Sequence, residues 1–112
     1  MAERAYLRAH AQRDKGEAEE YGRLCRNFPM LVHTSGLSQA IAFYQAKGHA
    51  GYLDDLADVL DQPGAWSTVR SALLPQYRRL TLDVMSAALW LKRFAEAELK
   101  QPKDAERTVQ DE

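Results

Sequence analysis

Apolar residues recur at helical spacing from Pro75 to Lys100, and this pattern constrains the fold more than any other feature of the sequence. They form two rows: the first is Tyr77, Leu80, Val84, Ala87, Leu91, Phe94 and Leu99, and the second is Leu82, Met85, Leu89 and Trp90. A helix that is apolar on two sides is normally packed on two sides. At 1.5 Å per residue it would be about 39 Å long. We therefore predict one long central helix that begins at Pro75, a residue suited to the first helical turn.

The rest of the chain also has helical periodicity, and no segment alternates as a strand would. We expect a long first helix over residues 3–27, a new helix that starts at Pro29, one over residues 37–47, and short helices within residues 52–64 and 65–74. Gly48 suits the left-handed position that ends a helix. The predicted fold is all-α, a compact bundle of five to six helices with long first and last helices. Residues 1–101 form a single helical domain, and residues 102–112 form a polar, disordered C-terminal tail.

Composition narrows the classes of function. The formal net charge is −1, from 15 basic and 16 acidic residues, so any contact with a polyanion must come from local clusters of charge. The single cysteine, Cys25, excludes an intrachain disulfide and fits a reducing compartment. The first residues lack the apolar core of a signal peptide, and no apolar run is long enough to cross a bilayer. We expect a cytoplasmic protein without a membrane partner.

Catalytic motifs are scarce. The three histidines have no companions at metal-ligand spacing, and no glycine-rich phosphate loop follows a strand. Cys25 is expected to pack as a small hydrophobic residue rather than to act as a nucleophile. The prediction is that the chain is not an enzyme and has no cofactor and no metal site.

One acidic cluster, Asp54, Asp55, Asp58 and Asp61, interrupts this picture. Positions 54, 58 and 61 share a helical face and would hold Mg²⁺ if further oxygens opposed them. A solvated face, or a patch that docks onto a basic neighbour, is the favoured interpretation. We predict that Asp54, Asp55 and Asp58 contact another subunit, and that the basic groups facing them are Arg4 and Arg8 or the pair Lys92 and Arg93.

Basic residues cluster near the ends of the expected helices, where acids are sparse. The ordinary interpretation of each is surface charge with a partly buried stem. The alternative is a face that contacts RNA phosphates, assembled from several helices. Its candidate residues are Arg23, Arg26, Lys47, Arg70, Arg78, Arg79, Lys92 and Arg93.

The corner "HTSGLSQ", residues 33–39, separates two expected helices. A helix, a short turn and another helix suggest a DNA-reading motif, but the second helix is rich in apolar residues and ends in a single cation. A capped restart between two packed helices is favoured. Approach of RNA to the hydroxyl and backbone N–H groups near Ser35 and Gly36 is a second use considered for this corner.

Two motifs resemble the small helical subunit of the type III-B CRISPR (Cmr) effector complex. The first is "FPMLVHTSGLSQAIAFYQAKG", in which Pro29, Ser35, Gly36, Leu37, Gln39, Ala42 and Phe43 match. The second runs from Tyr77 to Ala97, where the matching residues are Tyr77, Arg78, Thr81, Ala88, Leu89 and the run from Trp90 to Ala97. The resemblance spans about residues 3–100. It departs at Ser38, where the family often has glycine, a difference that bears on how closely a partner approaches there.

The resemblance implies a non-catalytic subunit used in antiviral defence. Proteins of this family stack head to tail beside the filament of backbone subunits that carries the guide RNA, and they line the channel that holds the guide–target duplex. The implied partners are the other Cmr subunits, chiefly the backbone subunit, further copies of the chain, the guide RNA and the target RNA. An alternative from the residues alone is a helical protein–protein adaptor without RNA binding.

Overall fold

The computed structural model describes residues 1–99 and consists of six α-helices over that range. Their bounds are α1 Ala2–Ala11, α2 Ala18–Ser35, α3 Leu37–Ala46, α4 Ala50–Leu60, α5 Ala65–Ser71 and α6 Leu74–Glu98. The predicted all-α fold is confirmed. The predicted C-terminal tail, residues 102–112, and the domain boundary at residue 101 lie outside the described residues.

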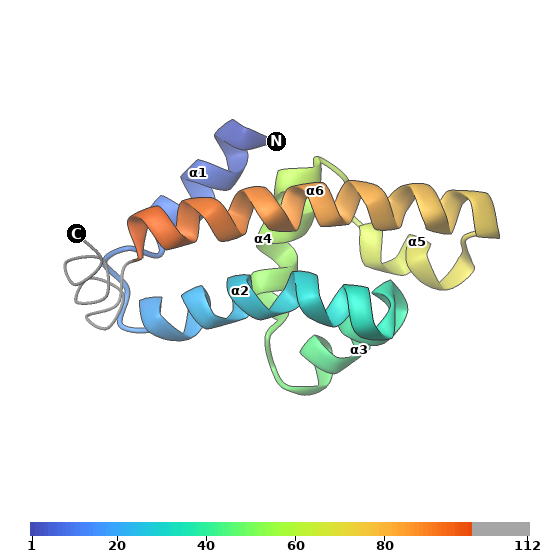
Figure 1. Cartoon of the computed structure of the whole chain (residues 1–112), viewed down its shortest axis with the longest axis horizontal. Coiled ribbons are helices and arrows are strands. Elements are labelled where there is room, and N and C mark those ends of the chain that lie inside the picture. Colours follow the sequence, from blue (N-terminus) through green and yellow to red (C-terminus); the bar gives the residue numbers. More distant parts are fainter. Residues whose placement is uncertain (100–112) are drawn as a thin grey trace.

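Helix α6 runs along the long axis of a molecule that measures 48 × 26 × 25 Å (Figure 1). Figure 1 shows α1 on one side of α6 and α2, α3 and α5 on the other, with α4 crossing between them. Helices α1, α2 and α4 all pack directly on α6, and α3 contacts α2, α4 and α5. The long last helix is therefore the element on which the others assemble, as its first apolar row predicts.

Small residues bring α1 close to α6. Ala5 and Ala9 of α1 are fully buried, and so are Ala87 and Ala88 of α6. A side chain no larger than a methyl group lets two helix backbones approach at the short end of the usual 8–10 Å range. The exposed first helix, whose sequence is only intermittently apolar, is held to the bundle by this narrow stripe.

An aromatic cluster fills the space between α2, α3 and α4. The ring of Phe28 lies 4.9 Å from that of Tyr44 and 5.3 Å from that of Tyr52, centroid to centroid. The Tyr44 hydroxyl donates to the Leu24 carbonyl at 2.8 Å. Cys25 is fully buried beside this cluster, and burial raises the pKa of its thiol, so it packs as a hydrophobic residue, as expected.

The second apolar row of α6 does not pack within the chain. Leu82 is 70% exposed and Leu89 is 39% exposed, although the sequence pattern predicts a helix covered on two sides. The start of the helix is as predicted, with Pro75 in its first turn. The prediction of two-sided packing is thus wrong for the chain by itself, because the described helices cover only one side of α6.

The predicted long first helix is also wrong, since it is two helices. The chain leaves α1 at Ala11 and starts α2 at Ala18, and the link between them contains Gly16, which is unfavourable in a helix. Pro29 does not start a new helix but lies buried inside α2. It has no N–H to give to the Cys25 carbonyl, and the packing of the neighbouring Phe28 in the core offsets that loss.

A single residue, Gly36, forms the corner between α2 and α3. Its φ of 85° and ψ of 161° define a region of backbone conformation that is essentially restricted to glycine. The Gly36 N–H donates to the Val32 carbonyl at 2.8 Å and closes α2. Across the corner, the Ser38 N–H donates to the Tyr77 hydroxyl of α6 at 3.1 Å. The favoured interpretation of this stretch, a restart between packed helices, agrees with this geometry.

Two other helix ends use left-handed residues. Gly48, with φ of 80°, follows α3 as predicted, and Asp61, with φ of 57°, ends α4 before the predicted stop at Pro63 and Gly64. Within residues 1–99, no helix combines the length and the apolar character that a membrane span requires.

Replacing Gly36 with alanine should destabilise the fold, because a Cβ is strained at its positive φ. Gly36→Ala is expected to lower the free energy of unfolding by about 1–3 kcal/mol. The control is Gly51→Ala in α4, where an added Cβ meets open space at helical dihedrals, so that a small gain in stability is expected. Urea unfolding of both variants measures the difference; equal stability of the two would contradict the strain at Gly36.

Candidate functional site

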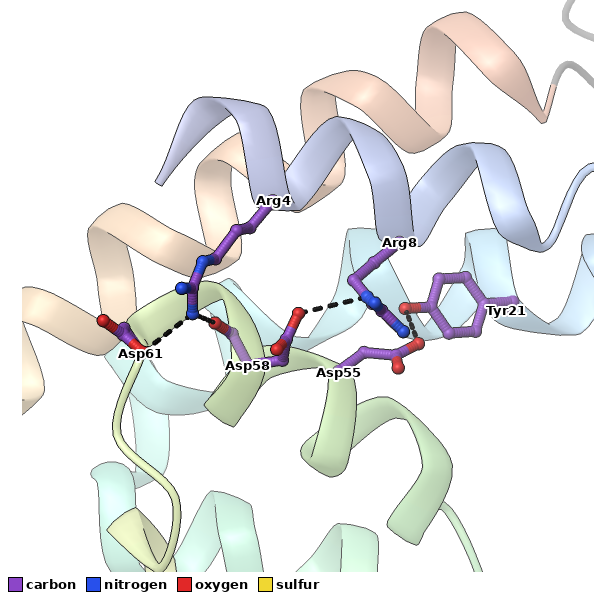
Figure 2. Close-up of polar contacts among 6 residues, drawn as sticks. All are labelled: Arg4, Arg8, Tyr21, Asp55, Asp58 and Asp61. Atoms are coloured by element: carbon purple, nitrogen blue, oxygen red, sulfur yellow. Dashed lines mark hydrogen bonds and ion pairs between the residues drawn. The ribbon is translucent and has the colours of Figure 1, made fainter.

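The basic face of α1 meets the acidic end of α4 within the same chain. Arg4 Nη1 lies 2.8 Å from Asp61 Oδ1 and 3.0 Å from the Asp58 carbonyl oxygen. Arg8 Nε lies 3.1 Å from Asp58 Oδ2. Figure 2 shows the two arginines on successive turns of α1, each pointing to α4. Arg4 and Arg8 are therefore satisfied internally, and their pairs are open to solvent on one side.

Asp55, one turn before Asp58, lies deeper between the helices and accepts a hydrogen bond from the Tyr21 hydroxyl at 2.6 Å (Figure 2). Burial raises the pKa of the Asp55 carboxyl, and the hydrogen bond from Tyr21 opposes that rise. Burial also raises the pKa of Tyr21 well above its ordinary value, so the phenol is the donor at neutral pH. This contact ties α2 to α4, and the Tyr21 partner of Asp55 was not predicted from the sequence.

The acidic and basic groups assigned to subunit contact thus meet inside one molecule. Arg4, Arg8 and Asp58 form ion pairs there and Asp55 is half-buried, whereas Asp54 is exposed and has no ion pair among residues 1–99. Asp54 also lines a surface hollow of about 610 Å³, whose other walls include Pro63, Gly64 and Trp66 of the α4–α5 segment. Contact with another subunit through these residues stays a prediction, and Asp54 is the carboxylate most available for it.

The metal alternative for this cluster finds no support in its geometry. Among residues 1–99, no three side chains of histidine, cysteine, aspartate or glutamate come together in a metal-binding group. Arginine side chains occupy the positions where an ion would need further oxygens.

The residues predicted to contact RNA differ from Arg4 and Arg8 in being largely without ion pairs. Of the eight, only Arg23 has one within the described part of the chain, to Glu20 at 2.6 Å. Lys47 Nζ instead lies 5.7 Å from the centre of the Phe43 ring, and the Arg93 guanidinium lies 5.9 Å from that of Trp90. Seven cations with no ion pair in residues 1–99 are available to bind an external anion.

These eight residues lie on two parts of the molecule. One group belongs to α2, the end of α3 and α5, and comprises Arg23, Arg26, Lys47 and Arg70. The other group belongs to α6 and comprises Arg78, Arg79, Lys92 and Arg93. The structure does not gather all eight into one patch.

The Gly36 corner offers less to an anion than the sequence suggests. The Tyr77 hydroxyl already accepts the Ser38 N–H at the start of α3, and this hydrogen bond lowers the pKa of Tyr77. A phosphate at this helix start would have to displace the phenol. Tyr77 lies 39 residues further along the chain, so only its place in the second motif connects it with this corner.

Comparison with known proteins places this helical fold in a CRISPR-associated class. The family described as "CRISPR-associated protein (Cas_Cmr5)" matches residues 1–98. The chain therefore belongs to the Cmr5 family, and the resemblance to the small subunit family of the Cmr complex is confirmed.

Two similar proteins come from Thermus thermophilus. The protein described as "CRISPR system Cmr subunit Cmr5" is 42% identical over 103 residues, which cover 86% of this chain and 90% of that protein. The crystal structure described as that of a CRISPR-associated Cmr5 family protein superposes with a TM-score of 0.83 at 36% identity, and the match covers 88% of this chain and 93% of that one.

The raised pKa of Asp55 predicts a pH dependence of stability. The folded chain holds this proton more tightly than the unfolded chain does. The resulting stability is fully present below the unfolded-state pKa and is lost as the pH rises through the folded-state pKa. Asp55→Asn keeps an acceptor for Tyr21 but does not titrate. The free energy of unfolding of the wild type minus that of the variant should therefore be larger in acid than at neutral pH.

Urea unfolding between about pH 4 and 7 measures this difference, across the range where a raised aspartate pKa lies. Tyr21→Phe removes the hydrogen bond that favours the carboxylate, so combining it with the same Asp55 comparison should enlarge the pH dependence. A difference that stays constant with pH, or grows toward neutrality, would show that Asp55 is not held in a protonation-favouring site.

Proposed function

We propose that the chain is a non-catalytic small subunit of a type III-B Cmr effector complex in the cytoplasm, where it stacks beside the backbone filament and contacts the guide–target RNA duplex through phosphates. Family membership supports the complex. The observation that supports RNA contact is the difference in pairing: the predicted subunit-contact arginines are in ion pairs, and seven of the eight predicted RNA-contact cations have none within residues 1–99.

Phosphate contact fits the kind of recognition that such a complex needs. Phosphates position a nucleic acid without reading its sequence, and the guide supplies the sequence by base pairing. A subunit that accepts any guide should therefore present cations rather than side chains shaped to base edges. Lys47 and Arg70, exposed at the ends of α3 and α5, have this character.

The net charge of −1 makes tight binding by a solitary chain unfavourable, since affinity for a polyanion follows the number of phosphates neutralised. Copies aligned along a filament overcome this limit, because each further contact then forms within the same assembly at a high effective concentration. RNA binding is therefore expected of the assembled complex rather than of the free subunit.

Stacking of like copies requires two different, complementary surfaces on each copy. Asp54 and the hollow beside it supply one acidic surface that is not used up within the chain. We assign the facing surface to basic residues of the next copy, as expected from the sequence.

A helical adaptor that binds only proteins is the alternative function. It is favoured by the exposed leucines of α6, which have no role in binding phosphate. It predicts that RNA neither promotes incorporation of the chain nor depends on its cations at any salt concentration.

Removing unpaired cations should reduce the salt dependence of target RNA binding. In the reconstituted complex, Lys47→Ala with Arg70→Ala is expected to lower the slope of log affinity against log salt by about one per residue for each bound copy. Arg4→Ala with Arg8→Ala is the matched control, since it removes the same charge from cations that are paired internally. Fluorescence anisotropy at several salt concentrations measures both. Equal slopes for the two double variants would contradict phosphate contact at Lys47 and Arg70.

Reversing the charge at Asp54 should weaken stacking and leave the fold intact. Asp54→Lys is expected to weaken incorporation by about tenfold or more, the scale of a lost charge pair at an interface. Asp14→Lys, an equal change in the exposed link between α1 and α2, is the control. Native mass spectrometry gives the copies per complex, and thermal unfolding checks the fold. Full incorporation of Asp54→Lys would rule out this contact.

A further inference from the structure

The outer side of α6 carries an apolar row that no described part of the chain covers. Leu74 is 61% exposed, Leu82 is 70% exposed, and Leu89 is 39% exposed, while Met85 between them is half-buried. These positions follow one another at three, four or eight residues and therefore share one helix face. Scattered surface leucines are ordinary, but a row along one face of the longest helix is the pattern of a contact surface.

The row has the spacing of a helix–helix seam. Leu82 and Leu89 are seven residues apart, with Met85 at the intermediate position, which is the a/d pattern through which two helices interdigitate. Beside Leu82 lies a surface hollow of about 620 Å³, lined also by Pro75, Gln76, Arg79 and Asp83. A side chain from a facing helix has room to enter there.

Cations border this row. Arg78 and Arg79 lie before Leu82, and Lys92 and Arg93 follow Leu89. None of these four has an ion pair within residues 1–99, and the acids of α6 are fewer: Asp83, Glu96 and Glu98, the last of which faces His10 at 3.3 Å. Charge complementarity therefore calls for a partner with apolar residues flanked by carboxylates.

Aromatic residues at the far end of the row favour protein over nucleic acid. The Trp90 ring stacks on Phe94 at 5.7 Å, and the Arg93 guanidinium lies 5.9 Å from the Trp90 ring. Phe94 in turn meets the edge of Tyr6 of α1. These contacts occupy the flat faces that a base would need for stacking. Tyrosine, tryptophan and arginine are instead the residues that dominate protein interfaces.

A second copy of this chain fits the face poorly. Pairing α6 with another α6 would bring the arginines of one copy against those of the other, in either orientation. The acidic helix α4 has no apolar row to offer, because its large apolar residues, Tyr52, Leu53, Leu56, Val59 and Leu60, are all buried. The occupant is therefore a different protein.

We propose that the outer face of α6 is the docking site for an acidic amphipathic helix of another protein, whose apolar residues pack on Leu82, Met85 and Leu89 and whose carboxylates pair with Arg79 and Arg93. The inference deepens the proposed function, since it takes that protein to be another subunit of the Cmr complex. It also divides the predicted RNA-contact residues: Arg23, Arg26, Lys47 and Arg70 face RNA, and the four cations of α6 face protein.

Photocrosslinking in the complex reconstituted from its own subunits and guide RNA tests the occupant directly. A photoreactive phenylalanine analogue replaces Leu82 in one preparation and Met30 of α2, which is 63% exposed, in the control. The expected result is a crosslink from position 82 to a helical segment rich in aspartate and glutamate in another subunit, identified by mass spectrometry. A crosslink to RNA, to a second copy or to a segment that is not acidic overturns the proposal, and so does the absence of any crosslink in an assembled complex.

Incorporation of variants supplies the second readout. Leu82→Gln with Leu89→Gln, and separately Arg79→Glu with Arg93→Glu, should each lower incorporation at least about tenfold, while Met30→Gln has no effect. Thermal unfolding confirms that the exposed substitutions leave the fold unchanged. Incorporation of both double variants at the wild-type level overturns the docking site and leaves the proposed function standing. Failure of the wild-type chain itself to enter the complex overturns the proposed function and the docking site together.

Discussion

The packing of the inner side of α6 is the interaction on which the rest of the structure depends. Val84, Ala87, Ala88 and Leu91 are fully buried there, and Ala95 is nearly so, in a stripe that receives α1, α2 and α4. Burial of apolar area along this stripe supplies most of the driving force for the fold. No ion pair in the described residues is buried enough to compete with it, since exposed pairs contribute about 0–1 kcal/mol each. The charged contacts of α1 with α4 therefore direct the helices, and the apolar stripe holds them.

This division explains how one small chain presents several charged surfaces. Because stability comes from the inner stripe, the charges on the outside are available for other purposes. Where acids and bases meet, as at Arg4, Arg8 and α4, they close the gap between helices. Where cations stand without acids, at the ends of α3 and α5 and along α6, they leave a surface that an external anion completes. The same element, α6, supplies the core on one side and a contact surface on the other.

Features set by local sequence were predictable, and those set by distant contacts were not. The spacing of Leu80, Val84 and Leu91 identified α6, and glycines 36 and 48 marked the ends of α2 and α3 because their conformations need that residue type. Pro29 misled, because whether a helix continues through proline depends on the packing around it. The pairing of Arg4 with Asp61 joins residues 57 positions apart, and no local pattern reports such a contact. The second apolar row was recognised in the sequence, but its exposure depends on which faces the other five helices cover.

The uncovered leucines of α6 also bear on how the chain behaves before it finds its partners. With a formal charge of −1 and an isoelectric point near 6.3, free molecules repel one another only weakly at neutral pH. An exposed row containing Leu82 and Leu89 then adds a tendency to associate nonspecifically. A chain built in this way is best produced together with the proteins that cover it, so its solubility becomes a property of the assembly rather than of the subunit.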